Sequence, residues 1–199
     1  IYKGKDRIQD GSRIMYSLKS FYNEGKYKFF FELGQTYSFS RNNVFDVQSG
    51  LSDIYSDFVS IFSIKYSDFV ELVNKLRIDK SNFNFENNET TLKIDYRKLK
   101  LKMDFYGLGK KAIQDTDLRF RNDLKSEVEW VLNRHWDVKY SNRSHIGAMQ
   151  EGERKLIDHA LGLVYKGKCL SANFSIEKDF TRLNDYTPST NYSLSINVP

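Results

Sequence analysis

The sequence has very little proline and cysteine, with two prolines and one cysteine among its 199 residues. Scarce proline, together with an aromatic content of 15%, argues against a disordered chain, because such chains are usually rich in proline and poor in aromatics. The single cysteine, Cys169, excludes an internal disulfide framework and any zinc site built from cysteines. We expect no resident metal and no cofactor.

Long hydrophobic runs are also absent. No stretch approaches 18 apolar residues, so no membrane-crossing helix is expected. A membrane β-strand needs only about ten residues of alternating polarity, so a β-barrel is still possible. The first residues, IYKGKDRIQDG, contain no apolar stretch typical of a signal peptide, which indicates either a cytoplasmic protein or a missing N-terminal portion.

Neither charge sign dominates the chain. Its 31 basic residues face 26 acidic ones, which gives a net charge of +5, and the two signs are interspersed. A protein that binds nucleic acid usually presents a continuous basic stripe to the phosphate backbone. We therefore expect no nucleic-acid partner.

The chain is rich in segments in which apolar and polar residues alternate. In the segment 99–105 (LKLKMDF) every second residue is apolar and the others are charged. Residues two apart line one side of a β-strand, whereas a helix would spread the same residues around its surface. The same alternation is present in the segments 27–39, 124–132, 170–180 and 192–198.

Two residues interrupt this alternation. Lys178 stands alone in the otherwise apolar row of 170–180. His159 is in phase with Ile157, Leu161 and Leu163, which is unusual for a row that faces lipid. Either His159 lies near a membrane interface or the alternation slips there. None of the three histidines is spaced from another as a metal ligand would be.

The pattern predicts eleven antiparallel strands, near 13–22, 26–40, 55–66, 68–79, 83–96, 98–107, 118–132, 136–146, 154–166, 168–181 and 189–198. Short connections alternate with longer ones along the chain, and the short link at 80–82 is the one exception. Transmembrane β-barrels alternate short periplasmic turns with longer external loops. The fold class is therefore predicted as all-β, an antiparallel up-and-down transmembrane β-barrel whose chain ends on the periplasmic side.

Five aromatic residues fall near predicted strand ends, where membrane barrels carry interfacial girdles. The alternative is that these aromatics fill a buried core. They are Tyr66, Phe69, Tyr96, Trp136 and Tyr165.

Catalytic patterns are weak. Glu127 and Glu129 share a strand face, but nothing places either one in the apolar setting that a glycosidase acid needs. The serines lack the glycines of a nucleophile elbow, and no phosphate-binding loop is present. We expect that the chain is not an enzyme.

Short segments of the chain match a known family in order and spacing. They are 4–13 (GKDRIQDGSR), 33–37 (LGQTY), 49–53 (SGLSD), 162–165 (GLVY), 178–181 (KDFT) and 188–190 (PST). Together they resemble the C-terminal barrel of the LptD family of LPS-assembly proteins, also called organic solvent tolerance proteins. The resemblance covers essentially the whole chain.

The resemblance implies an integral protein of the Gram-negative outer membrane, with residues 1–199 as the C-terminal portion of a larger barrel. In that family the barrel inserts lipopolysaccharide into the outer leaflet. The implied partners are lipopolysaccharide, outer-membrane lipid, an LptE-like lipoprotein plug and a periplasmic LptA-like bridge. The bridge would act through an N-terminal domain that this chain lacks.

The resemblance also assigns roles to individual residues. Cys169 matches a cysteine that forms a disulfide with the N-terminal domain, but the family usually has two adjacent cysteines where this chain has Lys168 and Cys169. The strand 189–198 matches the closing strand at a lateral seam. Its seam residues would be Tyr192, Leu194 and Ile196.

A set of lysines lies opposite the apolar rows and is predicted to face a wet lumen. We expect them to help pass an anionic lipid head group, or alternatively only to keep the interior solvated. They are Lys19, Lys28, Lys100, Lys102 and Lys125. Rival functions are a passive porin or autotransporter-type barrel and a soluble lipid- or sugar-binding β-protein.

Overall fold

The computed structural model describes residues 12–39, 50–109, 122–146, 156–180 and 188–198. Within these ranges every regular element is a β-strand. The strands are β1 (Arg13–Glu24), β2 (Tyr27–Ser38), β3 (Phe58–Tyr66), β4 (Val70–Ile78), β5 (Phe85–Tyr96), β6 (Leu99–Leu108), β7 (Asn122–Val131), β8 (Trp136–His145), β9 (Leu156–Lys166), β10 (Ser171–Asp179) and β11 (Ser189–Asn197).

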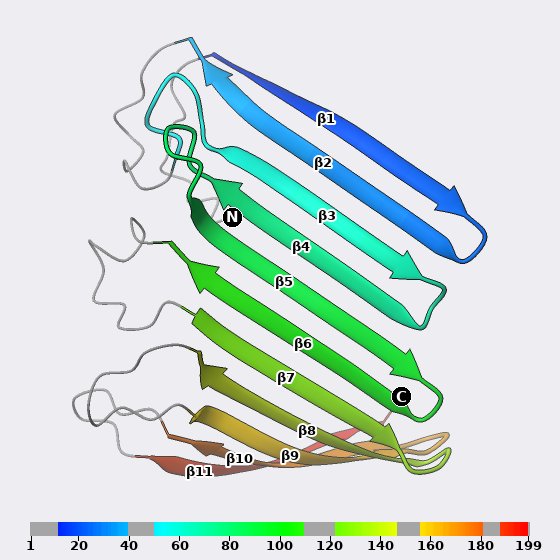
Figure 1. The fold of residues 1–199 in the computed structure, drawn as a ribbon. Helices are drawn as coiled ribbons and strands as arrows, with labels where there is room; N and C mark the ends of the chain where they lie inside the picture. Colours follow the sequence, from blue (N-terminus) through cyan, green and yellow to red (C-terminus); the bar gives the residue numbers. More distant parts are fainter. Residues whose placement is uncertain (1–11, 40–49, 110–121, 147–155, 181–187, 199) are drawn as a thin grey trace.

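All eleven strands form one sheet in which each strand pairs antiparallel with the next in sequence (Figure 1). This topology confirms the predicted all-β, up-and-down arrangement. β1 and β11 are the two edges, and they do not pair with each other, so the sheet is not closed. The hairpin turns lie at one end of the sheet, here called the turn side, and the remaining connections lie at the other end, the loop side (Figure 1).

The turns on the turn side are short because the backbone reverses at residues with positive φ. Gly25 (φ 56°) opens the two-residue link between β1 and β2, and Arg97 (φ 55°) opens the link between β5 and β6. Positive φ at the first turn residue suits the right-handed twist of paired strands. The predicted longer connections, near 41–54, 108–117, 147–153 and 182–188, lie largely outside the described residues.

The short link at 80–82 breaks the alternation for a local reason. Asp79 Oδ1 accepts hydrogen bonds from the backbone N–H groups of Ser81 (2.8 Å) and Asn82 (3.1 Å). An aspartate that accepts from the backbone two residues ahead stabilises a tight turn. The chain therefore reverses between β4 and β5 without a long loop, although the connection lies on the loop side.

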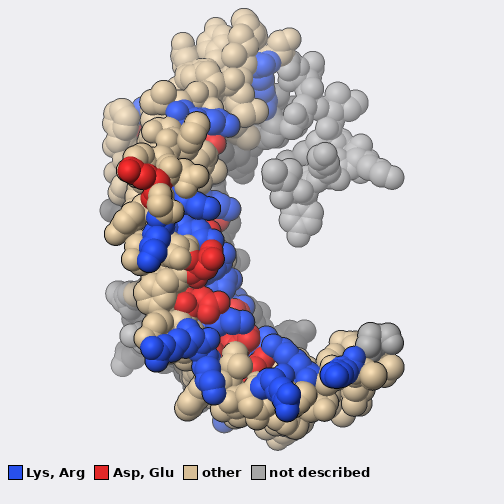
Figure 2. Space-filling model, turned by 90° about the vertical axis from the view of Figure 1, so that its right-hand side faces the viewer, with Lys and Arg blue, Asp and Glu red and all other residues tan. Residues whose placement is uncertain are grey.

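The register sorts the side chains onto two faces of different polarity. Lys93, Lys102 and Glu127 are cross-strand neighbours on one face, and Leu92, Met103 and Ser126 are neighbours on the other. Viewed from the turn side, the sheet is an open arc with the charged side chains gathered along its inner side (Figure 2). We call the charged side the concave face and the other side the outward face.

The separation of polar from apolar residues is not complete. Phe21 and Phe30 are register partners on the concave face of β1 and β2. On the outward face Asn74 Nδ2 donates to Asn88 Oδ1 (2.8 Å) and to Thr90 Oγ1 (2.7 Å). These outward polar groups therefore satisfy one another.

The described residues contain no buried hydrophobic side chain. Their buried members are all polar or charged: Ser38, Ser56, Asp57, Ser60, Asp79, Glu86, Asp104 and Asp137. Large apolar side chains are exposed instead, among them the outward residues Leu18 at 69% and Leu194 at 66%. A soluble β-sandwich buries an apolar face between its sheets, so this polarity contradicts that architecture.

The five aromatics predicted as a girdle all lie at the turn side, and none of them is buried. They pack against aromatic neighbours on adjacent strands, with ring centroids 5.0 Å apart for Trp136 and Tyr165 and 5.5 Å apart for Phe69 and Tyr96. They form a band along one end of the sheet and do not fill a core.

The segment 50–57 folds onto the loop-side ends of β2 and β4. Ser56 forms backbone and side-chain hydrogen bonds with Thr36, and its carbonyl accepts from Gln35 Nε2 at 2.8 Å. Asp57 Oδ2 lies 3.5 Å from Arg77 Nε. Gly50 has φ 69°, and a Cβ there would lie 2.3 Å from Asp57 Oδ2, so this close approach requires glycine. The segment 50–57 thus contacts the segment 33–37, which carries part of the family resemblance.

His159 is in phase with the outward apolar row. The register is irregular one step earlier, because Arg143 pairs with Asp158 and Ser144 pairs with Leu156, which leaves Ile157 as the extra residue of a bulge. The alternation therefore slips at Ile157, and His159 remains on the same face as Leu161 and Leu163.

Candidate functional site

The concave face carries a cross-strand ladder of charged side chains, most of which lie opposite a charge of the other sign. Lys65 of β3 is opposite Glu71 of β4, and Glu71 is opposite Lys93 of β5. Lys93 is opposite Lys102 of β6, a pair of like charge, and Lys102 is opposite Glu127 of β7. Directly opposed residues on one face of an antiparallel pair lie close enough to interact, and opposite charges there are stabilising.

Several of these charges form ion pairs. Lys93 Nζ lies 3.0 Å from Glu71 Oε2. Glu129 lies between two lysines, since its Oε1 is 3.3 Å from Lys100 Nζ and its Oε2 is 3.2 Å from Lys139 Nζ. One carboxylate thus bridges β6, β7 and β8 through side chains alone.

Two carboxylates of this face are buried. Asp104, 4% exposed, accepts from Lys102 Nζ (2.6 Å) and from the Thr91 hydroxyl (2.7 Å). Asp137, 2% exposed, forms an ion pair with Lys166 of the neighbouring strand β9. Buried carboxylates are stable only when they are paired and hydrogen-bonded. The lysines therefore stabilise the fold as well as lining the surface.

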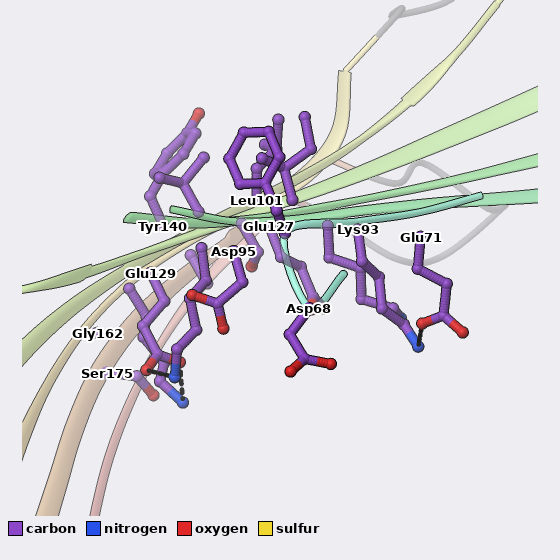
Figure 3. A pocket seen from close by; sticks show the side chains of 18 of the residues that line it. Asp68, Glu71, Lys93, Asp95, Leu101, Glu127, Glu129, Tyr140, Gly162 and Ser175 are labelled. Atoms are coloured by element: carbon purple, nitrogen blue, oxygen red, sulfur yellow. Dashed lines mark hydrogen bonds and ion pairs between the residues drawn. The ribbon is translucent and has the colours of Figure 1, made fainter. Parts of the chain in front are cut away.

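The ladder lines a groove of about 590 Å³ in the concave face. Figure 3 shows Glu71 and Lys93 paired at one end of the groove and Glu129 at the other. Leu101 and Tyr140 point to the opposite side of the strands in the same view. The groove is therefore polar and charged, and the sheet separates it from an apolar outer surface.

Asp68 lies in the turn between β3 and β4, at the turn-side end of the groove. Its carboxylate is 2.8 Å from Lys65 Nζ, and this hydrogen-bonded ion pair lowers the pKa of the Asp68 carboxyl below its usual value. The turn therefore keeps a negative charge at the mouth of the groove.

The register places all five predicted lysines on the concave face, and most of them have carboxylate partners. Lys19 lies 3.2 Å from Glu32, and Lys125 lies 2.6 Å from Glu127. Lys100 and Lys102 pair as described above, and Lys28 is opposite Lys65 in the register. The sequence indicated the positions of these lysines but not their pairing.

The concave face changes character toward β11. Its residues on β10 and β11 are mostly small and uncharged, and Ser175 Oγ lies 2.6 Å from Ser193 Oγ. The uncharged residues on this part of the face are Ser171, Asn173, Ser175, Ser189, Asn191, Ser193, Ser195 and Asn197. The wall next to the edge thus offers hydrogen-bonding groups but few charges.

The predicted seam residues lie on the outward face of β11, which is an edge strand. They are strongly exposed: Tyr192 at 70%, Leu194 at 66% and Ile196 at 57%. Cys169 is exposed and has a free thiol, in the turn between β9 and β10. Next to it, the Gly167 N–H donates to the Leu170 carbonyl at 2.8 Å, which fixes that turn.

Two other kinds of site are absent from the described ranges. Those ranges contain no helical segment with the length and apolar character needed to cross a membrane. They also contain no group of three or more His, Cys, Asp or Glu side chains that could hold a metal ion.

Comparison with protein families gives a match over residues 1–136 to the family described as LptD: LPS transport system D. The match covers more than half of the chain. The chain belongs to the LptD family. No match was found among curated proteins.

Membership of the LptD family confirms the resemblance inferred from the short sequence segments. It supports a role in the transport and assembly of lipopolysaccharide, and it agrees with the β-rich fold. The matched residues end at Trp136, so Cys169 and β11 lie outside them.

In this LptD-family chain, the sequence did not predict that two of the carboxylates would be buried. Asp104 and Asp137 each sit in an alternating charged row and look like solvated residues. A possible signal was the flanking lysine, because Lys102 is two residues from Asp104 and so shares its strand face.

Replacing the buried Asp104 should destabilise the protein far more than replacing an exposed acid of the same face. Asp104→Ala leaves Lys102 and Thr91 without their acceptor, which should cost about 2–3 kcal/mol. The control is Glu127→Ala, whose pair with Lys125 is exposed, with an expected cost below about 1 kcal/mol. Denaturant titration of the intact protein in detergent measures both, and equal losses would contradict the assigned role of burial.

Proposed function

We propose that this chain is part of an integral outer-membrane β-barrel that inserts lipopolysaccharide into the outer leaflet. The observation that carries the proposal is the inverted polarity of the sheet, with apolar residues outward and charged residues on the concave face, in a chain of the LptD family. An apolar outer face and a polar interior are the pattern of a transmembrane barrel. A soluble lipid-binding protein would need a buried apolar core.

The two sheet edges support a larger barrel. Unpaired backbone N–H and C=O groups are very costly in hydrocarbon, so a membrane sheet must be closed. β1 and β11 are both edges here. In the proposed barrel, further strands complete the wall, and residues 1–199 form its C-terminal portion.

The concave face suits the head group of lipopolysaccharide, which carries phosphates and sugars. As the head group moves along the face, each lysine can release its carboxylate partner and pair with a lipid phosphate instead. The lysines and the phosphates therefore keep a partner of opposite charge throughout the passage. Toward β11 the serine and asparagine side chains can hydrogen-bond sugars. The passage needs no chemical step, in keeping with a transport function.

β11 has the features of a lateral seam. Its concave side chains are serine and asparagine, which pack weakly in a sheet compared with β-branched or aromatic residues. Its outward residues Tyr192, Leu194 and Ile196 can contact the acyl chains of the lipid as these chains enter the bilayer. We propose that lipid leaves where β11 meets the first strand of the complete barrel.

An LptE-like lipoprotein plug and a periplasmic LptA-like bridge complete the proposed pathway. The plug would occupy the wet interior that the concave face lines. The bridge would deliver lipid through an N-terminal domain on the periplasmic side. Cys169 lies at the turn side, which is the periplasmic side in this arrangement, so its exposed thiol can reach that domain.

Cross-linking the seam should block export. A cysteine at Leu194, bridged to a cysteine on the strand that meets β11 in the closed barrel, should abolish delivery of lipopolysaccharide to the cell surface. The matched control bridges Leu194→Cys to Phe174→Cys, its register partner on β10, and should leave export intact. Undiminished export from a fully cross-linked seam would exclude this exit route.

Cys169→Ser should remove a disulfide that links the barrel to the N-terminal domain. On a non-reducing gel, the full-length variant should lack the band of the disulfide-bonded form. Lipopolysaccharide delivery should fall because the N-terminal domain is no longer held in place. Lys168→Ser, at the adjacent turn position, is the control and should leave the oxidised band unchanged. Identical band patterns for Cys169→Ser and wild type would contradict the proposed bond.

A further inference from the structure

One polar row crosses the otherwise apolar outward face of the last strands. The row runs from β7 to β11 through successive register partners, which are Ser126, Asn142, His159, Lys178 and Thr190. Lys178 and His159 are the two residues at which the alternation fails in the sequence, and the register makes them direct cross-strand neighbours. We call these five residues the outward polar row.

One aromatic ring contacts both Lys178 and His159 of the row. Lys178 Nζ lies 5.2 Å from the centroid of the Phe180 ring, a distance at which an ammonium is attracted to an aromatic face. The His159 ring packs against the same ring, with centroids 5.3 Å apart and planes inclined by 63°. The two polar groups are therefore brought to one small area of the outward surface.

The outward polar row shares its face of the described strands with no acidic residue. The outward-facing residues of β7 to β11 include no aspartate or glutamate. The concave lysines differ, because Lys100, Lys102 and Lys125 each have a carboxylate within 3.3 Å. An ammonium on an apolar surface needs an anion, and the described strands β7 to β11 place no carboxylate on that surface.

At β10 and β11 the row lies near the loop-side ends of the strands, whereas on β7 Ser126 lies in the middle of the strand. Lys178 is the penultimate residue of β10, and Thr190 is the second residue of β11. Apolar residues continue from the row toward the turn side, as with Leu161 and Leu163 on β9. In the proposed barrel the loop side faces the outer leaflet, so the row reaches the depth of the lipid head groups, where a charged side chain is tolerated.

We propose that the outward polar row binds the phosphate of a lipopolysaccharide molecule in the outer leaflet, directly beside the seam at β11. The site rests on the proposed function, because only an inserted barrel presents this face to lipid. A phosphate supplies the anion for Lys178 and acceptor oxygens for the side chains of Asn142, His159 and Thr190. Lipid that leaves at β11 meets Thr190 and Lys178 first, so the row holds the released lipid at the outer side of the exit.

Competition between two forms of one lipid tests the site. The intact protein with its plug is equilibrated with lipid A carrying its phosphates and with the same lipid A after dephosphorylation, and bound lipid is counted by native mass spectrometry. Wild type should prefer the phosphorylated form. Lys178→Ser should reduce this preference about fivefold, the effect of one basic residue near a membrane surface, and adding His159→Ser should reduce it further.

Two variants control for charge and position. Lys168→Ser removes the same charge from the same hairpin at its turn side and should leave the preference unchanged. Lys178→Arg keeps the charge and should also retain the preference. A Lys178→Ser, His159→Ser double variant that prefers phosphorylated lipid A as strongly as wild type would overturn the proposal.

Inorganic phosphate separates a lipid site from a site for free phosphate. An excess of inorganic phosphate should fail to displace phosphorylated lipid A, and ready displacement would overturn the assignment to lipid. Heat-modifiable gel mobility and surface delivery of lipopolysaccharide are followed in parallel. A barrel that inserts and exports lipid without any phosphate preference refutes this site alone, whereas a wild-type chain that never enters the membrane refutes the proposed function.

Discussion

Inverted polarity is the constraint on which the rest of the structure depends. A sheet that exposes Leu18, Leu194 and many other large apolar side chains on its outward face, while the buried side chains of the described residues are all polar, has no hydrophobic core in those residues. In the proposed barrel, its stability comes from backbone hydrogen bonds along the strands and from the lipid that surrounds its outward face. Each structural feature described above fits that setting: long strands, a band of aromatics at one end and ion pairs on the concave face.

The fold was largely predictable because a period of two is easy to recognise. The segment around Leu101 and Met103 alternates so strictly that only a strand fits it, and all eleven predicted strands are present. The short link after Asp79 was visible in the sequence as an exception, and its cause is the set of hydrogen bonds to that carboxylate. The irregularity near His159 was also visible, but its place at Ile157 needed the register.

The candidate site was less predictable, because alternation assigns a side chain to a face but not to a partner. The lysines of the concave face were recognised one by one, whereas the position of Glu129 between Lys100 and Lys139 depends on which strands are neighbours and in what register. The same holds for Lys178 and His159, which are 19 positions apart in sequence and directly opposed in the sheet. Pairing across strands is therefore the information that the chain alone does not display. The register decides which charged side chains of the concave face form ion pairs and hydrogen bonds with one another.

The measurement that tests the central claim most directly is the solvent exposure of each face in a membrane. Spin labels at Phe62 and Met103 probe the outward face, and labels at the adjacent residues Ser63 and Lys102 probe the concave face. With the intact protein in lipid bilayers, the account predicts that the outward labels relax mainly by collision with oxygen, which dissolves in lipid. The concave labels should relax mainly by collision with a water-soluble nickel complex. Equal access of the nickel complex to both faces would contradict the account.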